Sequence, residues 1–379
     1  MLKAFSAALS CQSPPMNEQS GGVSRRSFLY GAAAVLAGTA GLEGLPTTEK
    51  TPDTSALKNA ARQSGKTLGM YTVQHQLLLE PVAAAIIADT FSMIADGNDL
   101  KFSGHLRPDP HSYDFSYGDN TVSWAEKHHM LFRGHCLVWW NALPDWFASY
   151  VNAANAKQVM TEHINKVVTH YAGRVYSWDV VNEAIHFDGR SDGLRRKPWV
   201  EFIGPEYVDL AFQTAHAADP KARLVLNECY IEHNTASEIA RRGAFLALAT
   251  RLKKANVPIT AIGVQGHLRG NTPLDKPGMI DFMKRIHDLG LEIMITELDV
   301  DDVDVPGPMI DQTVASKYGE FIELVGPYVK VITFEELSDD PNVPKRPDGL
   351  AHRPNLLDLE YQTTPAFSAT VKALKALTA

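Results

Sequence analysis

The sequence has few of the features that mark several large classes of protein. It contains three cysteines, Cys11, Cys136 and Cys229, in 379 residues, and their spacing fits neither a metal site nor a disulfide framework. We expect Cys136 and Cys229 to be free, buried thiols, because they fall in separate predicted strands that are not neighbours. The formal net charge is -8 and no basic run or stripe is present, so nothing indicates a nucleic-acid partner.

Two further absences bear on cofactors. No G-x-G-x-x-G or G-x-x-x-x-G-K-[ST] loop follows a predicted strand, which argues against dinucleotide-binding and P-loop chemistry. No cluster of cysteine, histidine and carboxylate residues has the spacing of a metal site. We therefore expect neither a metal nor a cofactor.

The N-terminal segment has the pattern of an export signal. Ser24-Arg25-Arg26-Ser27-Phe28-Leu29 contains a twin-arginine pair, followed by an uncharged, small-residue run over residues 31–42. This run is shorter than the roughly 20 residues that span a bilayer, so a cleaved signal is favoured over a retained membrane anchor. We predict a signal over residues 1–45, a linker or N-terminal arm over 46–65 and a catalytic domain over 66–379. The mature protein would then be periplasmic or extracellular, without stable membrane association.

From residue 66 onward, short apolar runs alternate with segments of helical periodicity. Strands are predicted over residues 68–73, 91–95, 131–139, 175–181, 223–227, 261–265, 292–298 and 329–334. Helices are predicted over residues 81–88, 120–129, 156–171, 205–218, 236–255, 279–289, 312–325 and 365–377. Eight strand–helix pairs in alternation predict an α/β fold, a single (β/α)8 TIM barrel. A doubly wound sheet with extra strands is the alternative.

Two of the predicted strands end in a carboxylate. Trp178-Asp179-Val180-Val181-Asn182-Glu183 and Ile293-Met294-Ile295-Thr296-Glu297 are apolar, β-branched runs of the kind that is buried on both faces. In a parallel barrel, the carboxyl ends of the strands meet at one rim, where active sites lie. Cleavage of a glycosidic bond requires two carboxyl groups of this kind at one site.

Other strand ends carry polar or aromatic side chains that would share this rim. They are Asn98 and Lys101, His135 and Trp139, Asn182 and Glu183, Asn227 and Glu228, Gln265 and His267, Glu297 and Asp299, and Glu335 and Glu336. Each alone has an ordinary structural interpretation, as a helix cap, a surface charge or a packed core residue. Together, however, they indicate one shared polar site.

Glycoside cleavage assigns different tasks to these groups. One carboxyl group must donate a proton to the leaving oxygen, while the other, ionised, attacks or activates water. A separation of about 5–5.5 Å would mean retention and about 6.5–9.5 Å inversion. Asn182 is suited to bond a sugar 2-hydroxyl, and His267 and Asp299 can hold Glu297 ionised. Trp139 offers an apolar face, and Lys101 and His135 can donate to hydroxyls.

Four stretches together resemble family 10 of the glycoside hydrolases, the endo-β-1,4-xylanases. They are Arg133-Gly134-His135 with Leu137-Val138-Trp139 and Leu143-Pro144-Asp145-Trp146-Phe147, Trp178–Ala184, Ile262-Gly263-Val264-Gln265-Gly266-His267, and Ile295-Thr296-Glu297-Leu298-Asp299. The resemblance implies that Glu183 is the acid/base and Glu297 the nucleophile of a retaining enzyme, with His267 supporting the nucleophile. It also implies that Asn182, Lys101, Asn98, His135 and Trp139 contact the glycone sugars, and Gln265 is part of the supporting set.

The chain departs from the family pattern around the predicted sugar pocket. Gly97 and Phe102 stand where the family has Glu and Trp, Trp140 and Ala142 where it has His and Gln, and Glu335-Glu336 where it has Trp-Gly. The two glutamates are retained. We therefore expect an intact retaining mechanism with altered aromatic stacking and hydrogen bonding upstream of the scissile bond.

The sequence supports a secreted endo-β-1,4-xylanase that is a monomer and takes xylan or its oligosaccharides as substrate. A retaining hydrolase of the same fold that acts on another β-glycan or a glycosylated small molecule is the first alternative, favoured by Glu335. A non-catalytic sugar-binding barrel is the second, and retention of both glutamates argues against it.

Overall fold

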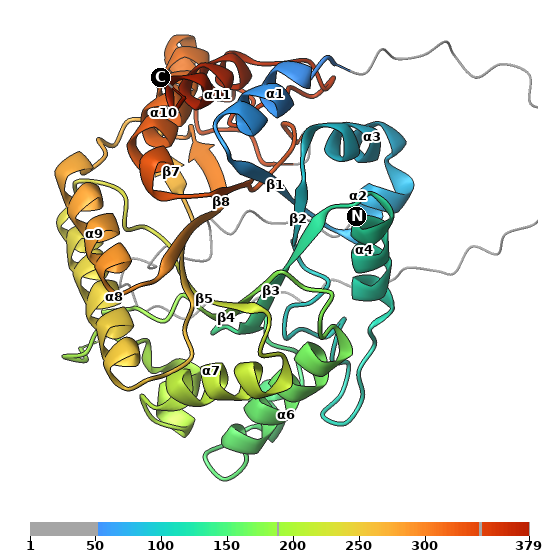
Figure 1. The fold of residues 1–379 in the computed structure, drawn as a ribbon, viewed down its shortest axis with the longest axis vertical. Coiled ribbons are helices and arrows are strands. Elements are labelled where there is room, and N and C mark those ends of the chain that lie inside the picture. Colours follow the sequence, from blue (N-terminus) through green and yellow to red (C-terminus); the bar gives the residue numbers. More distant parts are fainter. Residues whose placement is uncertain (1–51, 188, 341–342, 379) are drawn as a thin grey trace, which may run out of the picture.

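Eight parallel strands close into a barrel, and a ninth, short strand lies outside the ring (Figure 1). The computed structural model describes residues 52–187, 189–340 and 343–378. The strands are β1 (Thr67–Thr72), β2 (Met93–Asp96), β3 (Leu131–Val138), β4 (Ser177–Asn182), β5 (Arg223–Glu228), β6 (Ala261–Val264), β7 (His267–Arg269), β8 (Glu292–Asp301) and β9 (Val331–Phe334). Neighbours follow chain order from β1 to β6, then β8 and β9, and β9 pairs with β1. The predicted (β/α)8 barrel is confirmed.

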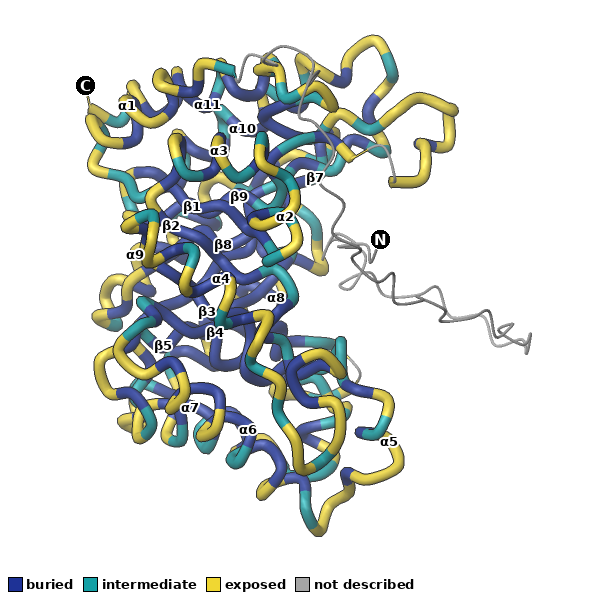
Figure 2. The backbone as a smooth tube through the Cα atoms, turned by 90° about the vertical axis from the view of Figure 1, so that its right-hand side faces the viewer, coloured by how far each residue is buried: buried dark blue, intermediate teal, exposed yellow. Residues whose placement is uncertain are grey.

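Helices surround the ring on its outside (Figure 1). They are α1 (Ser55–Gln63), α2 (Gln74–Leu79), α3 (Pro81–Thr90), α4 (Ser116–Lys127), α5 (Phe147–Tyr150), α6 (Ala156–His170), α7 (Tyr207–Ala218), α8 (Ala236–Lys254), α9 (Lys276–Asp288), α10 (Ile310–Val325) and α11 (Pro365–Ala376), with short turns η2 (Arg196–Val200), η3 (Gly307–Met309) and η4 (Gly326–Tyr328). Their inner faces are buried and their outer faces exposed (Figure 2). In α6, the buried positions Val159, Met160, Ile164, Val167 and Val168 repeat every three or four residues, which gives the helix one apolar stripe.

The strands have two buried faces with different partners. Met93, Val225, Ala261, Met294 and Val331 form a small cluster inside the ring. The remaining apolar strand residues pack outward against the helices in the main core. Near-continuous apolar runs are therefore required in these strands, as the sequence predicted.

The structure adds elements that the sequence did not predict. Helix α1 lies in the segment expected to be a linker or N-terminal arm, with Leu57, Ala60 and Ala61 buried, and it lies beside α11 (Figure 1). Strand β7 begins three residues after the last residue of β6 and pairs with β8. The packed part of the chain therefore begins before residue 66.

The two cysteines within the described residues differ. Cys136 is a free, buried thiol as expected, whereas Cys229 is buried and disulfide-bonded, so the expectation of a free thiol at Cys229 is wrong. Spacing along the chain does not fix disulfide connectivity. The twin-arginine segment lies outside the described residues. Among the helices that the structure describes, none is both long and apolar enough to cross a membrane.

Candidate active site

The two predicted catalytic glutamates lie at the carboxyl-end rim of the barrel and are each 1% exposed. Glu183 directly follows β4 and has a φ of 54°, a left-handed conformation that is costly for a residue with a side chain. Its N–H donates to Asn227 O at 2.9 Å, and Arg195 Nε donates to its carbonyl at 3.2 Å. The surrounding bonds therefore hold Glu183 in a strained backbone conformation, which is common at functional sites.

Glu297 lies within β8, at an irregularity of the strand. The register of β8 against β9 shifts between Ile295 and Leu298, and such shifts re-aim side chains. Asn227 Nδ2 donates to Glu297 Oε1 at 2.7 Å, and His267 Nε2 lies 3.3 Å from Glu297 Oε2. These contacts orient the carboxylate.

Electrostatics keep Glu297 ionised. Burial raises the pKa of Glu297, but the hydrogen bond from His267, the charges of His135 and His267, and the hydrogen bond from Asn227 outweigh it and lower the pKa to about 2. Burial lowers the pKa of His267, yet the adjacent carboxylates of Asp299 and Glu297 raise it well above its ordinary value. A protonated His267 can donate through both ring nitrogens, to Asp299 Oδ1 at 2.8 Å and to Glu297.

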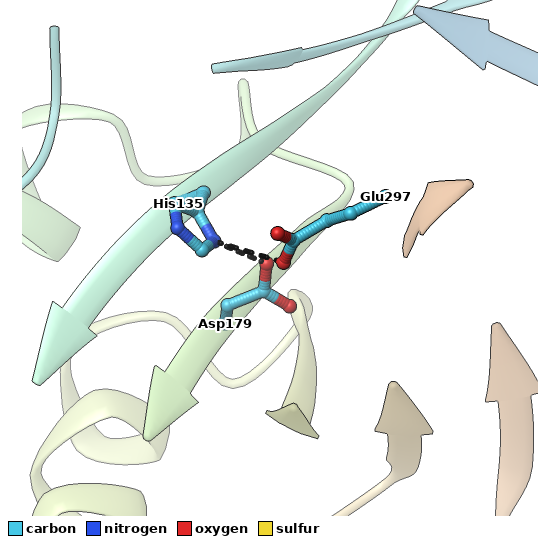
Figure 3. A group of neighbouring side chains, drawn as sticks. All are labelled: His135, Asp179 and Glu297. Atoms are coloured by element: carbon cyan, nitrogen blue, oxygen red, sulfur yellow. Dashed lines mark hydrogen bonds and ion pairs between the residues drawn. The ribbon is translucent and has the colours of Figure 1, made fainter. Parts of the chain in front are cut away.

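A buried ion pair lies below Glu297 in the barrel. Arg133 Nη2 donates to Asp179 Oδ1 at 2.6 Å, and His135 Nδ1 lies 3.0 Å from Asp179 Oδ2. Figure 3 shows His135 facing both Asp179 and Glu297, and its Nδ1 lies 3.9 Å from Glu297 Oε1. His135 therefore lies between the predicted nucleophile Glu297 and Asp179, the carboxylate that Arg133 holds in place.

Three groups of side chains in the described residues have donor atoms close enough to hold a metal ion. They are His135 with Asp179 and Glu297, Glu232 with His233 and Glu238, and Asp301 with Asp302 and His352. In each group an arginine already contacts a carboxylate: Arg133 on Asp179, Arg269 on Glu238 and Arg346 on Asp302. One carboxylate of each group is thus already paired with an arginine, and the expected absence of a metal stays a prediction.

A chain of side-chain amides joins the two glutamates. Asn227 Nδ2 donates to Asn182 Oδ1 at 2.9 Å as well as to Glu297. Asn182 Nδ2 lies 3.5 Å from Glu183 Oε1. Gln265 Nε2 donates to Asn182 Oδ1 at 3.2 Å and lies 3.5 Å from Glu183 Oε1. The predicted supporting residues Asn182 and Gln265 are therefore brought together with both carboxyl groups, and Asn227 is the hub.

One hydrogen bond to the Glu183 carboxyl group was not predicted from the sequence. Trp140 Nε1 donates to Glu183 Oε2 at 2.7 Å, and the Arg195 guanidinium lies 4.2 Å from the centroid of the Trp140 ring. The sequence marked Trp140 only as a departure from the family pattern. Arg195 carried no signal, because it lies in a long loop away from any strand end.

The predicted sugar-contacting residues occupy one side of the rim. Lys101 Nζ lies 5.3 Å from the centroid of the Trp139 ring, and the Trp139 ring lies 6.2 Å from that of His135. Asn98 is half-buried just after β2. At Gly97 an added Cβ would lie 3.1 Å from Thr72 O, so the backbone leaves little room for a side chain there.

Phe102 does not line this pocket, contrary to the expectation from the sequence. It is 3% exposed and stacks on His163 of α6 with ring centroids 4.0 Å apart. Trp146 and Trp199 also lie against it. Phe102 is thus a core residue, because its side chain points toward the helices rather than the rim.

Several buried polar atoms at the rim have no hydrogen-bond partner among the described residues. They are Tyr71 Oη, Trp139 Nε1, Gln265 Oε1 and Glu335 Oε2. Buried polar groups are nearly always paired in folded proteins, so unpaired donors and acceptors at one place indicate a site for a polar ligand. A sugar, with many hydroxyl groups, has the chemistry to satisfy them.

A parallel barrel that presents an ionised, buried glutamate and a second glutamate across a chain of amides defines a glycoside hydrolase. The chain belongs to glycosyl hydrolase family 10, whose family profile matches residues 56–373. The fold and the resemblance expected from the sequence are confirmed.

Curated relatives and solved structures agree with this assignment. The beta-1,4-xylanase of Dictyoglomus thermophilum is 36% identical over 265 residues, which cover 66% of this chain and 72% of that protein. Endo-1,4-beta-xylanase 2 of Claviceps purpurea is 30% identical over 268 residues, covering 71% and 79%. The crystal structure of xylanase 10B from Thermotoga petrophila RKU-1 in complex with xylobiose superposes with a TM-score of 0.77 at 27% identity, covering 88% of this chain and 100% of that one.

Proposed function

We propose that the protein is a retaining endo-β-1,4-xylanase that cleaves internal bonds of xylan by double displacement. The observation that carries this proposal is the pairing of Glu297, held ionised by His267 and Asn227, with Glu183, which the amide chain holds nearby. A nucleophile must be ionised and a general acid must be oriented on the leaving oxygen.

In the first step, Glu297 attacks the anomeric carbon while Glu183 gives its proton to the glycosidic oxygen, and the aglycone departs. The product is a covalent glycosyl ester on Glu297. In the second step, Glu183 takes a proton from water, the water oxygen attacks the same carbon, and the Glu297 carboxylate is released. Two inversions give net retention.

The remaining rim residues have roles that suit a neutral polysaccharide. Asn182 is placed to bond a sugar 2-hydroxyl, a contact that strengthens in the transition state. Lys101 and His135 supply donors, and Trp139 supplies an apolar ring. A xylose polymer is supported as the substrate by the relatives that are named xylanases and by the xylobiose complex of a structurally similar xylanase.

The test is release of reducing sugar from xylan, β-glucan and mannan, with the first product anomer followed by NMR. We expect xylan to be the best substrate and the β-anomer to form first. Glu183→Gln and Glu297→Gln serve as matched inactive controls. Initial α-anomer would contradict retention, and a clear preference for β-glucan or mannan would contradict the substrate.

One structural observation favours a second candidate, a retaining hydrolase of another β-glycan. Glu335 stands where the resembled family has Trp, and its carboxyl oxygen Oε2 is buried at the rim. The same substrate panel separates the two candidates. A sugar-binding barrel without turnover would bind xylo-oligosaccharides without releasing any product.

We propose further that the chain is exported through its twin-arginine signal and works as a monomer outside the cytoplasm. The support is the Ser24-Arg25-Arg26-Ser27-Phe28-Leu29 pattern. Replacing Arg25 and Arg26 by Lys should retain the protein inside a bacterial host, as measured by fractionation. Size-exclusion chromatography with light scattering measures the molar mass in solution and so tests whether the protein is a monomer.

A further inference from the structure

Glu335 directly follows β9, the strand that closes the barrel, and its direction follows from the alternation of that strand. Val331 belongs to the cluster inside the ring, whereas Phe334 packs against Phe91 and Tyr318 on the helix side. The next side chain therefore turns inward. The Glu335 N–H donates to Leu298 O at 3.1 Å, which fixes it beside the residue that follows Glu297.

One oxygen of the Glu335 carboxyl group lacks a hydrogen-bond partner among the described residues. Its Oε2 is buried and makes no hydrogen bond within the described part of the chain. A buried, unpaired carboxyl oxygen is costly in an empty site. The cost is removed when a ligand supplies the missing hydrogen-bond partner.

Charged and titratable groups face Glu335 from every neighbouring element. They are Tyr71 of β1, Glu297 and Asp299 of β8, His267 of β7 and Lys101 of the segment after β2. On its own segment, Glu336 accepts from Asn355 Nδ2 at 3.3 Å. His267 already contacts Glu297 and Asp299 through its two ring nitrogens, and Lys101 lies over Trp139. Neither His267 nor Lys101 forms an ion pair with Glu335 within the described residues, although the charge of each opposes the rise in the pKa of Glu335.

We propose that Glu335 is a specificity-determining residue, which enters the sugar site in its neutral form and donates its carboxyl hydrogen to a hydroxyl oxygen of the sugar held at Glu297. This assignment rests on the proposed function. Where the family has the apolar face of a Trp ring, Glu335 offers one polar donor. The site would thus select a sugar ring that turns a hydroxyl group toward β9.

The neutral form follows from the geometry. A nearby negative charge disfavours ionisation of a buried carboxyl group, and His267 and Asn227 hold the neighbouring Glu297 ionised. Burial and then the charge of Glu297 raise the pKa of Glu335 well above its ordinary value. A protonated carboxyl group offers an O–H donor that a carboxylate lacks.

Two variants at this position separate donation from mere space filling. The substrate is an aryl β-xylobioside with a good leaving group, so that proton transfer from Glu183 does not limit the rate. Glu335→Gln keeps an N–H donor, and its kcat/KM should stay close to that of the wild type. Glu335→Ala loses the donor, and its kcat/KM should fall by about 2- to 12-fold.

The pH profile supplies a readout that a structural role would not move. The wild type should lose this contact as the pH rises through the pKa of Glu335, since the ionised group has no hydrogen to donate. Glu335→Gln should not show that loss. Glu323→Gln, at an exposed position on α10, is the matched control and should behave as the wild type. A Gln variant as poor as the Ala variant, or identical pH profiles for wild type and Gln variant, would overturn the proposal.

A spectroscopic measurement keeps this inference separate from the proposed function. Infrared difference spectra of wild type minus Glu335→Gln at neutral pH should contain the carbonyl stretch of a protonated carboxyl group. This measurement needs no substrate, so it decides the neutral form even if xylan is not turned over. A carboxylate band alone would overturn the proposal, whereas absence of xylan turnover with the protonated band present would reject only the substrate.

Discussion

Trp140 donates its indole N–H to Glu183 Oε2 at a distance of 2.7 Å. The indole is itself fixed, because the Arg195 guanidinium lies over its ring. Orientation of a general acid on the leaving oxygen governs its efficiency. We therefore propose that Trp140 positions Glu183, the proposed general acid.

Replacing Trp140 by Phe keeps an aromatic ring and removes the donor. We expect kcat on xylan to fall by about 2- to 12-fold, the scale of one hydrogen bond. An aryl glycoside with a good leaving group should be much less affected, because its departure needs little protonation. Trp124→Phe on α4, whose ring stacks on His128, is the control. Equal losses on both substrates would contradict the positioning role.

Glu297→Gly removes the proposed nucleophile and leaves space at the anomeric carbon. Hydrolysis should drop by about 10⁴-fold or more, the scale seen when a catalytic nucleophile is removed. Transfer from an α-xylobiosyl fluoride to an acceptor sugar should persist, because Glu183 still supplies the base. The companion variant Glu183→Ala should be rescued by azide with an aryl donor and yield a β-glycosyl azide. Full hydrolytic activity in Glu297→Gly would refute the assignment.

The pH dependence of the site should respond to His267. The pKa of Glu297 is about 2, below its ordinary value of 4.5, so the nucleophile stays ionised until the pH falls close to 2. The same shift contributes stability that is present above about pH 4.5 and is lost as the pH falls through 2. His267→Asn removes the main donor and a positive charge, and the pKa of Glu297 should rise. The acidic limb of kcat/KM should then move to higher pH; an unmoved limb would show that Asn227 and His135 suffice.

The buried pair below the site should matter for folding more than any surface pair. Arg133→Met leaves Asp179 buried without its guanidinium partner, and we expect a loss of about 3–5 kcal/mol in the free energy of unfolding. Arg174→Ala breaks the pair with Glu126 on the surface and should cost about 0–1 kcal/mol. Urea denaturation followed by fluorescence measures both. Comparable losses in the two variants would contradict the role of burial.

The barrel and the two glutamates could be predicted because both depend on local patterns. Apolar runs of strand length, each ended by a carboxylate, place Glu183 and Glu297 on one rim as soon as the strands are parallel. Gln265 and His267 are brought there by the same rule. Their neighbourhood follows from chain direction alone, without any knowledge of packing.

What could not be predicted depends on side-chain direction within loops. The contact of Trp140 with Glu183 depends on the left-handed backbone at Glu183 and on the stacked Arg195. Neither can be inferred from the periodicity of apolar residues along the sequence. Phe102 was expected at the pocket because it stands in a motif, but its side chain points to the core. Helix α1 lacks a strong apolar run, and β7 has only three residues. The hydrophobic pattern of the sequence therefore predicted neither element.

Closure of the barrel joins a strand that is synthesised early to one that is synthesised late, because Thr67 of β1 pairs with Val331 of β9. Until β9 is in place, β1 and β8 each present an open row of backbone donors and acceptors, the kind of edge that recruits strands from other chains. A chain cut after α10 would thus carry two mutually complementary edges and no means of joining them internally. Its expected fate is intermolecular pairing and aggregation rather than a slightly smaller enzyme.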